Sequence, residues 1–196
     1  MKVEIGFSLQ QRYALPITQF IPLLKEQGFS AVSPLWAPEL DLALLASCVQ
    51  EHNMLIQSLH ATYTNIPLLW KPKEEGALFV FQNVMQSIED CTRFGIATLV
   101  VHGWQGLMYS FPKEPLDFYF FDKLVQYADA KGVSIAFENL EGEEYLDALM
   151  TRYLWQSNVG YCWDSGHDNC YPHKIDFLEK LFAAMYDELP EPKKRR

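Results

Sequence analysis

Long apolar runs are missing from this sequence: no stretch reaches the roughly 18 residues that a helix needs to cross a bilayer. The N-terminal segment MKVEIGFSLQ alternates like a strand, whereas a signal peptide would have a basic patch followed by an apolar run. The sequence also lacks a CxxC pair, and its four cysteines are interpreted as reduced thiols. These absences favour a cytoplasmic protein with no membrane association.

Positive charge is also scarce. The sequence has 16 Lys and Arg residues against 25 Asp and Glu residues, which gives a formal net charge of −9. A negative surface opposes long-range attraction to phosphate backbones, although an acidic protein can still carry a local basic groove. Nucleic acid is therefore a disfavoured partner. The polar tail 190–196, PEPKKRR, is interpreted as a solvated end rather than a phosphate-binding patch.

The sequence does contain enough apolar material for one sizeable core. Of its 196 residues, 49% are hydrophobic and 21% are charged. Six short β-rich runs recur, and each is followed by a longer stretch with apolar residues at helical spacing. The runs span residues 3–8, 31–36, 55–60, 98–102, 134–139 and 160–164. This alternation predicts a single α/β domain, residues 1–196, with a parallel sheet covered by helices.

The number of units is small for the closed form of this architecture. A TIM-type barrel has eight strands, typically in about 250 residues, whereas only one more amphipathic segment, 175–189, follows the sixth run. We therefore expect a parallel (β/α) TIM-barrel type of fold that is incomplete, with about six of eight βα units. An open sheet by design, a truncated or split gene product, and strands from another chain are the alternatives. Because unpaired sheet edges promote association, a homo-oligomer or a complementary chain is expected.

Polar side chains end four of the predicted strands. The motifs SLHA, VVHGW, AFENL and CWDSGH place His60, His102, Glu138 and Asp164 at the ends of the third to sixth runs. The carboxyl ends of parallel strands meet at one mouth of a barrel, where functional residues gather. Each histidine taken alone fits a hydrogen-bonded core position. Their recurrence on consecutive strands indicates instead that ligand-type side chains converge on one site.

Glu138, Asp164 and His167 are the predicted metal ligands. A carboxylate after the apolar segment SIAF is costly unless it is paired or metal-bound, and a structural salt bridge is the alternative. Asp164 can instead cap the following helix, because Asp side chains accept hydrogen bonds from free helix N–H groups. Such a cap does not require His167. The turn through Gly166 lets His167 fold back as a further metal ligand or as a substrate contact.

Aromatic residues also occur near the strand ends. Trp36 and Trp104 are candidate substrate-binding residues, because an aromatic face can stack on the C–H face of a sugar. Core packing is the alternative for each of them. Trp163 is expected to point away from the mouth if Asp164 points into it. The connection 61–76 is long for a βα loop and is a candidate substrate cover.

Taken together, the motifs LHA, VVHG, FENL and WDSGH resemble those of the xylose isomerase-like barrels. That superfamily contains sugar-phosphate isomerases and epimerases as well as the endonuclease IV group. The resemblance extends from the first strand to Tyr171, which is nearly the whole chain. ENL and WDSGH, in this order and spacing, are the more specific motifs.

The resemblance implies a divalent metal (Mn, Zn, Co or Mg) bound by Glu138 and Asp164. In the family a histidine from the seventh strand and a glutamate from the eighth complete the site, and neither has a counterpart here. The residue matched by His167 contacts substrate in the isomerases and binds a further zinc in the endonucleases. His60 and His102 match positions that are zinc ligands in the endonucleases and that line the substrate pocket in many isomerases.

The expected activity is that of a metal-dependent sugar or sugar-phosphate isomerase or epimerase. By resemblance, the reaction passes through an enediolate, with Glu138 as the strand-end acid and base and His167 as a further catalytic residue. His60, His102, Trp36 and Trp104 would bind the substrate. Two alternatives remain open: a truncated, inactive or partner-completed barrel without catalysis of its own, and a zinc-dependent apurinic endonuclease-like phosphodiesterase, which the acidic charge opposes.

Overall fold

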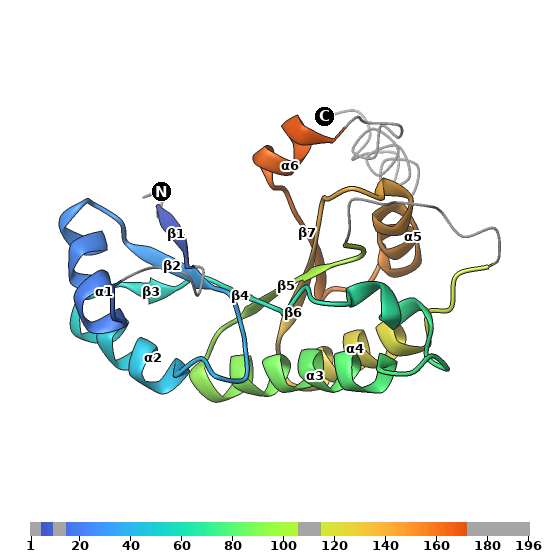
Figure 1. Cartoon of the computed structure of the whole chain (residues 1–196), viewed down its shortest axis with the longest axis horizontal. Coiled ribbons are helices and arrows are strands. Elements are labelled where there is room, and N and C mark those ends of the chain that lie inside the picture. The colour runs from blue at the N-terminus through green and yellow to red at the C-terminus, as the bar shows by residue number, and fades with distance from the viewer. Residues whose placement is uncertain (1–4, 10–14, 106–114, 172–196) are drawn as a thin grey trace, which may run out of the picture.

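The computed structural model describes residues 5–9, 15–105 and 115–171 of the chain. Strands and helices alternate along these segments (Figure 1). The tail 190–196 and the amphipathic segment 175–189 lie outside the described residues. The elements are β1 (Gly6–Leu9), α1 (Ile17–Glu26), β2 (Ala31–Pro34), α2 (Leu42–Glu51), β3 (Leu55–Ile56), β4 (Leu59–His60), η1 (Ile66–Trp70), α3 (Ala77–Phe94), β5 (Thr98–His102), α4 (Tyr119–Ala130), β6 (Ser134–Glu138), α5 (Glu143–Tyr153), β7 (Val159–Cys162) and α6 (Ser165–Cys170).

All strand pairs in the described part of the chain are parallel, as predicted. They form one sheet in the order β1-β2-β3 and another in the order β4-β5-β6-β7. A parallel bridge between Leu35 and His60 joins the two sheets, and the Trp36 amide donates to the His60 carbonyl at 2.7 Å. The strands therefore follow one another around a common curved wall. This is the arrangement of a TIM barrel that is partial within the described residues.

The third predicted strand, 55–60, is split into two pieces. Its first half, β3, pairs with β2, whereas its second half, β4, pairs with β5. Between them, the Gln57 amide still donates to the Val32 carbonyl at 2.9 Å. The first half of this strand thus pairs with the strand before it and the second half with the strand after it. Tilted barrel strands contact both of their neighbours in this way. Seven assigned strands in the described residues therefore correspond to the six predicted runs.

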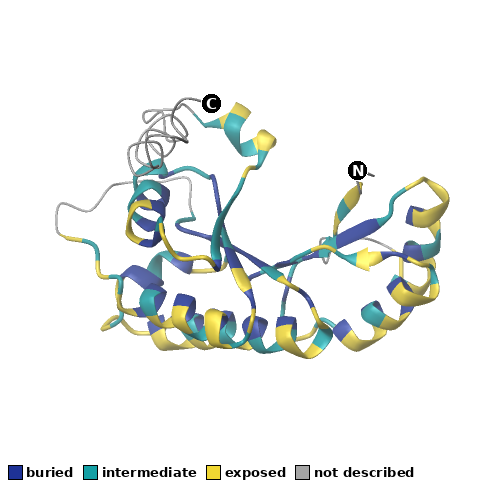
Figure 2. Cartoon of the chain, turned by 180° about the vertical axis from the view of Figure 1, so that it is seen from behind, coloured by how far each residue is buried: buried dark blue, intermediate teal, exposed yellow. Residues whose placement is uncertain are grey.

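Helices α1 to α5 lie along the convex side of this wall (Figure 1), and α2, α3, α4 and α5 contact its strands. On α3 the residues Val80, Val84, Ile88 and Cys91 are all at most 3% exposed, and their spacing of about one helical turn puts them on one face. Figure 2 shows buried strands beneath helices whose outer faces are exposed. None of the helices in the described ranges is both long and apolar enough to span a membrane.

The central strands β5 and β6 of the four-stranded sheet are deeply buried. Leu99, Val101, Ile135 and Phe137 are each at most 1% exposed, between the helices and the barrel interior. Burial of such side chains contributes about 1.5–3 kcal/mol each. These two strands end in His102 and Glu138, so their packing fixes the positions of both side chains.

Candidate metal centre

The register of the parallel strands brings the first three polar residues together. His102 and Glu138 are register partners at the carboxyl ends of β5 and β6. His60 ends β4, whose register partner on β5 is Val100. Because parallel strands end at the same edge of the sheet, side chains from three different units meet there.

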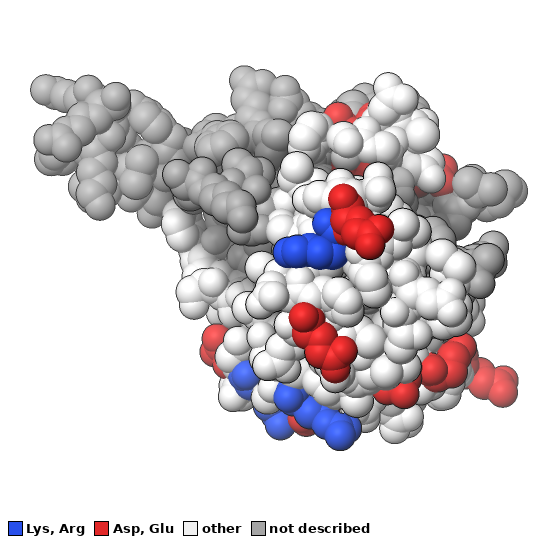
Figure 3. Space-filling model, turned by 90° about the vertical axis from the view of Figure 1, so that its left-hand side faces the viewer, with Lys and Arg blue, Asp and Glu red and all other residues white. Residues whose placement is uncertain are grey.

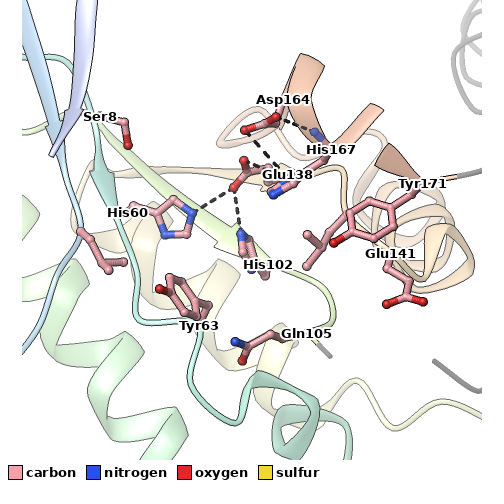
Figure 4. Close-up of a pocket in the computed structure, with 12 residues that line it drawn as sticks. Ser8, His60, Tyr63, His102, Gln105, Glu138, Glu141, Asp164, His167 and Tyr171 are labelled. Carbon is pink, nitrogen blue, oxygen red and sulfur yellow. Dashed lines mark hydrogen bonds and ion pairs between the residues drawn. The ribbon is translucent and has the colours of Figure 1, made fainter. Parts of the chain in front are cut away.

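Glu138 lies at the centre of the group (Figure 4). Its Oε2 atom is 2.9 Å from Nε2 of His60 and 3.0 Å from Nε2 of His102. The Glu138 side chain is only 7% exposed. A buried carboxylate is costly without partners, and two imidazole rings supply them here.

The electrostatics of the group favour an ionised carboxylate beside neutral imidazole. Burial by itself raises the pKa of the Glu138 carboxyl, but the His102 and His60 rings beside its Oε2 atom hold this pKa well below its usual range. Burial also lowers the pKa of His102, and the two neighbouring imidazoles lower it further, against the opposing effect of Glu138. At neutral pH these are the protonation states that metal ligands need.

The ring of His60 is oriented as in a metal-binding histidine. Its Nδ1 atom lies 2.7 Å from the carbonyl oxygen of Ala61, which can only accept, so Nδ1 is the donor. Nε2 then carries a lone pair in the neutral ring and faces the Glu138 carboxylate. A proton or a cation has to lie between two such acceptors. Ligating histidines usually donate their second nitrogen to a carbonyl in this way, so His60 fits a metal site.

His102 is less suited to this role. Its Nδ1 atom is buried and has no hydrogen-bond partner within the described segments. In the neutral ring Nε2 carries the proton that it donates to Glu138. His102 therefore fits the role of a hydrogen-bond donor that fixes the carboxylate better than it fits the role of a ligand. Even so, one potential ligand atom from each of His60, His102 and Glu138 lies within 4.8 Å of the others.

A second group of potential ligands shares Glu138. It consists of Glu138, Asp164 and His167, the three predicted metal ligands, and their ligand atoms also lie within 4.8 Å of one another. Oε1 of Glu138 is 3.6 Å from Nδ1 of His167, which is 3.9 Å from Oδ2 of Asp164. The two oxygens of Glu138 thus face different groups: Oε2 faces the histidines of β4 and β5, and Oε1 faces the turn after β7.

Strand β7 ends at Cys162, two residues before the predicted end at Asp164. Asp164 is the N-cap residue of α6, and its Oδ1 atom accepts the His167 amide hydrogen at 2.8 Å. Capping fixes the backbone here and ends the strand early. The capping alternative is therefore correct for one oxygen of Asp164, while Oδ2 remains beside His167. Capping and ligation are compatible.

These residues line a pocket of about 410 Å³. Figure 4 shows His60, His102 and Glu138 facing one another within it, with Asp164 and His167 beside them. The lining also includes several residues that the sequence did not single out as site residues. The lining residues are Ser8, Leu35, His60, Tyr63, His102, Gln105, Glu138, Leu140, Glu141, Asp164, His167 and Tyr171.

Two of the additional lining residues are informative. The Tyr63 ring stacks on His102 with a centroid distance of 5.8 Å and an interplanar angle of 16°. Glu141 has a buried Oε2 atom without a hydrogen-bond partner in the described part of the chain. A sequence signal existed for both, because Tyr63 lies in the long connection after His60 and Glu141 follows Glu138 in the same strand-end loop.

The two predicted substrate-binding tryptophans are not among the residues that line this pocket. Trp36 is 4% exposed, and its indole N–H donates to Oδ2 of Asp90 at 2.7 Å. Trp104 stacks on Tyr145 with a centroid distance of 4.4 Å. Their positions match the core-packing alternative. Trp163 is 60% exposed and is not among the residues that line the pocket.

The connection 61–76 is anchored to the body of the protein. Its Ile66, Leu69 and Trp70 side chains are buried, and the Trp70 indole N–H donates to the Gly103 carbonyl at 2.7 Å. Tyr63 is the residue of this connection that lines the pocket. The connection therefore supplies one wall of the site and also supports the residue after His102.

Comparisons with known proteins agree with this fold. A family model described as xylose isomerase-like TIM barrel matches residues 21–189. A search of curated proteins finds no match. Among solved structures, the IOLI protein with a bound zinc atom is 18% identical, with a TM-score of 0.68 over 91% of this chain and 68% of that one.

Two further solved structures share the fold. The 3-keto-D-glucoside 4-epimerase YcjR from E. coli is 17% identical, with a TM-score of 0.65 over 96% of this chain and 77% of that one. An AP endonuclease of family 2 from Brucella melitensis is 19% identical, with a TM-score of 0.61 over 94% of this chain and 76% of that one. Because the family model covers most of the sequence and the fold agrees, the chain belongs to the xylose isomerase-like TIM barrel family.

Proposed function

We propose that this protein is a metal-dependent isomerase or epimerase of a small keto sugar or sugar phosphate, acting through an enediolate. The observation that carries the proposal is the position of Glu138. It is a buried, ionised carboxylate at a pocket wall, with imidazoles on one oxygen and the Asp164 turn beside the other. Enolisation needs a carboxylate near a site that stabilises negative charge on oxygen.

The proposed metal ligands are Glu138, Asp164 and His167. His60 is a candidate ligand for a second cation beside Glu138. Their mixed nitrogen and oxygen donors suit Zn, Mn and Co, and Mg is a further candidate. When bound, the cation would polarise the substrate carbonyl and stabilise the enediolate. The IOLI structure, which shares the fold, contains zinc.

The remaining catalytic roles are assigned to residues of the protein. His60 and His102 hold Oε2 of Glu138 and so fix the carboxylate that is the proposed acid and base; its Oε1 atom faces the Asp164 turn, where the proposed cation would lie. The same two rings keep the pKa of Glu138 low, so the carboxylate stays ionised at neutral pH and is a weak base. If Glu138 and Asp164 hold the cation without His167, Nε2 of His167 is the proposed second proton carrier or substrate contact.

The substrate class follows from the pocket. Its volume of about 410 Å³ is in the range of small-molecule sites. The described lining residues include no Lys or Arg, which favours an uncharged sugar over a sugar phosphate. We propose that Glu141 accepts a hydrogen bond from a substrate hydroxyl, because its buried, unpartnered Oε2 otherwise pays a desolvation cost.

A zinc-dependent phosphodiesterase is the second candidate function. The pair of ligand groups that share Glu138 favours it, because phosphoryl chemistry often uses two neighbouring cations. The formal net charge of −9 opposes it. On the face shown in Figure 3, acidic and basic side chains are interspersed and the described residues form no continuous basic surface.

We also propose a cytoplasmic location and an assembly with a second chain. All four cysteines are free, which suits a reducing compartment. Within the described ranges, β1 and β7 each pair with a single strand, and such edges favour association. A barrel that is active only with a partner, or inactive, is the alternative to an enzyme that acts alone. Analytical ultracentrifugation of the full chain tests the assembly, and a stable monomer would contradict it.

Proton exchange in deuterated water tests the proposed chemistry. The metal-loaded protein is incubated with a panel of ketoses, and deuterium at the sugar carbons is followed by NMR. Enolisation would introduce deuterium at a carbon next to the carbonyl. The Glu138→Gln variant should introduce none. If no ketose is labelled while abasic DNA is cleaved, the second candidate function replaces the first.

A further inference from the structure

We infer that Asn139 is a positioning residue that sets Asp164 and His167 against Glu138. This inference deepens the proposed function and rests on it for its consequence in metal and substrate binding. Asn139 directly follows Glu138 at the end of β6, and it is 7% exposed. Successive side chains of a strand point in opposite directions, so Glu138 faces the pocket while Asn139 reaches toward the turn after β7.

The side chain of Asn139 clamps the backbone of Asp164 from both sides. Its Oδ1 atom accepts the Asp164 amide hydrogen at 2.6 Å, and its Nδ2 atom donates to the Asp164 carbonyl at 2.8 Å. The Asn139 amide also donates to the Cys162 carbonyl at 3.2 Å. The clamp therefore continues the pairing of β6 with β7 beyond the end of both strands. It fixes where the carboxylate of Asp164 leaves the backbone.

The main chain of Asn139 also fixes the ring of His167. Nδ1 of His167 lies 2.9 Å from the Asn139 carbonyl oxygen, and because that oxygen can only accept, Nδ1 is the donor. The lone pair of the neutral ring is then on Nε2, which has no hydrogen-bond partner among the described residues. The backbone amide of His167 donates to Asp164, so this residue is held at two points.

The consequence is a division of roles between the two nitrogens of His167. Nδ1 lies 3.6 Å from Oε1 of Glu138, but its proton is committed to Asn139. A metal ion or a substrate proton must therefore be taken by Nε2. The end of β6 thus carries the central predicted ligand, Glu138. The next residue, Asn139, fixes the positions of the two other predicted ligands, Asp164 and His167.

Only an amide side chain can make this clamp. Aspartate keeps the acceptor but has no donor for the Asp164 carbonyl, and alanine has neither group. Asn158 provides a matched control, because it is also a buried asparagine, 8% exposed, whose Nδ2 donates to a backbone carbonyl, that of Val125, at 3.0 Å. Asn158 precedes β7 at the opposite end of that strand, away from the pocket.

The test compares Asn139→Ala, Asn139→Asp and Asn158→Ala with the natural full chain. Affinity for Zn²⁺ and Mn²⁺ is measured by calorimetry, and the tautomer of His167 is read from long-range ¹H–¹⁵N NMR spectra of the metal-free protein. We expect both Asn139 variants to bind metal about 10–100-fold more weakly. The turn that carries His167 is then no longer held to β6 through Asp164, so His167 should move away from the Asn139 carbonyl and lose the fixed Nδ1–H state. Asn158→Ala should change neither. If Asn139→Ala does not fold, Asn139→Asp carries the test.

A double-mutant cycle separates positioning from general loss of structure. If Asn139 acts through His167, Asn139→Ala should weaken metal binding much less in a His167→Ala background than in the natural sequence. Equal losses in both backgrounds, equal losses in Asn158→Ala, or an unchanged His167 tautomer would each overturn the inference. The tautomer is observed without metal or substrate. It therefore still tests Asn139 if the natural protein proves to bind no metal and the proposed function fails.

Discussion

Nε2 of His60 lies 2.9 Å from Oε2 of Glu138, although 78 residues separate them in the chain. The two side chains end β4 and β6, with β5 between them. Because Nδ1 of His60 already donates to the Ala61 carbonyl, the contact with Glu138 needs a shared proton or a cation. This pair is thus the most direct support for the proposed binding site at the strand ends.

Loss of either of two carboxylates should weaken metal binding. Glu138→Gln and Asp164→Asn keep the side-chain volume but remove the negative charge and a ligand oxygen. We expect each variant to lose bound metal, with affinity reduced at least about 10-fold. Metal content of the purified protein, measured by mass spectrometry, checks this. Asp122→Asn, which alters an acid held by Arg152 away from the pocket, is the control. Undiminished metal in both site variants would contradict the metal centre.

Acid should destabilise the metal-free protein in two steps. The pKa of His102 is lowered in the folded state, so the unfolded chain binds more protons and stability falls as pH drops below about 6.5. The pKa of Glu138 is also lowered, so its contribution is present above about pH 4.3 and is lost as pH falls further. Urea denaturation from pH 8 to pH 3 checks both steps. The lower step should be missing in Glu138→Gln, and its persistence would assign that step to other groups.

Glu141→Gln should weaken substrate binding without affecting metal. The amide keeps the size of the side chain but replaces one carboxylate oxygen by a donor. We expect KM to rise about 10-fold, which corresponds to about 1.4 kcal/mol. Steady-state kinetics with a ketose that passes the exchange test, together with metal analysis, check this. An unchanged KM would show that the buried oxygen of Glu141 does not contact the substrate.

Trp36→Phe separates core packing from sugar stacking. The substitution removes the indole N–H that donates to Asp90, and the free energy of unfolding should fall by about 1–2 kcal/mol. KM should stay the same, because Trp36 does not line the pocket. Urea denaturation and steady-state kinetics measure the two effects. A raised KM at unchanged stability would restore the substrate-binding role that the sequence predicted.

The strand ends could be identified from the sequence because their signal is local. VVH and AFE are short apolar runs that close on a polar residue, and parallel strands of such runs share one edge. Trp36 and Trp104 were harder to assign, since the direction of a side chain at a strand end depends on the loop and the helix beside it. Asp90, which binds Trp36, lies 54 residues away on α3.

The sequence by itself thus determined the order of the βα units and the residues that end them. Apolar runs and helical spacing are patterns among neighbouring residues in the chain, so they can be recognised without the fold. Only the tertiary structure decided how those ends share their atoms. In the fold, Oε2 of Glu138 contacts His60 and His102, and Oε1 lies beside His167. The fold also makes Asp164 a helix cap held by Asn139. Hydrogen bonds between distant strands set these choices, and sequence spacing does not encode their distances or directions.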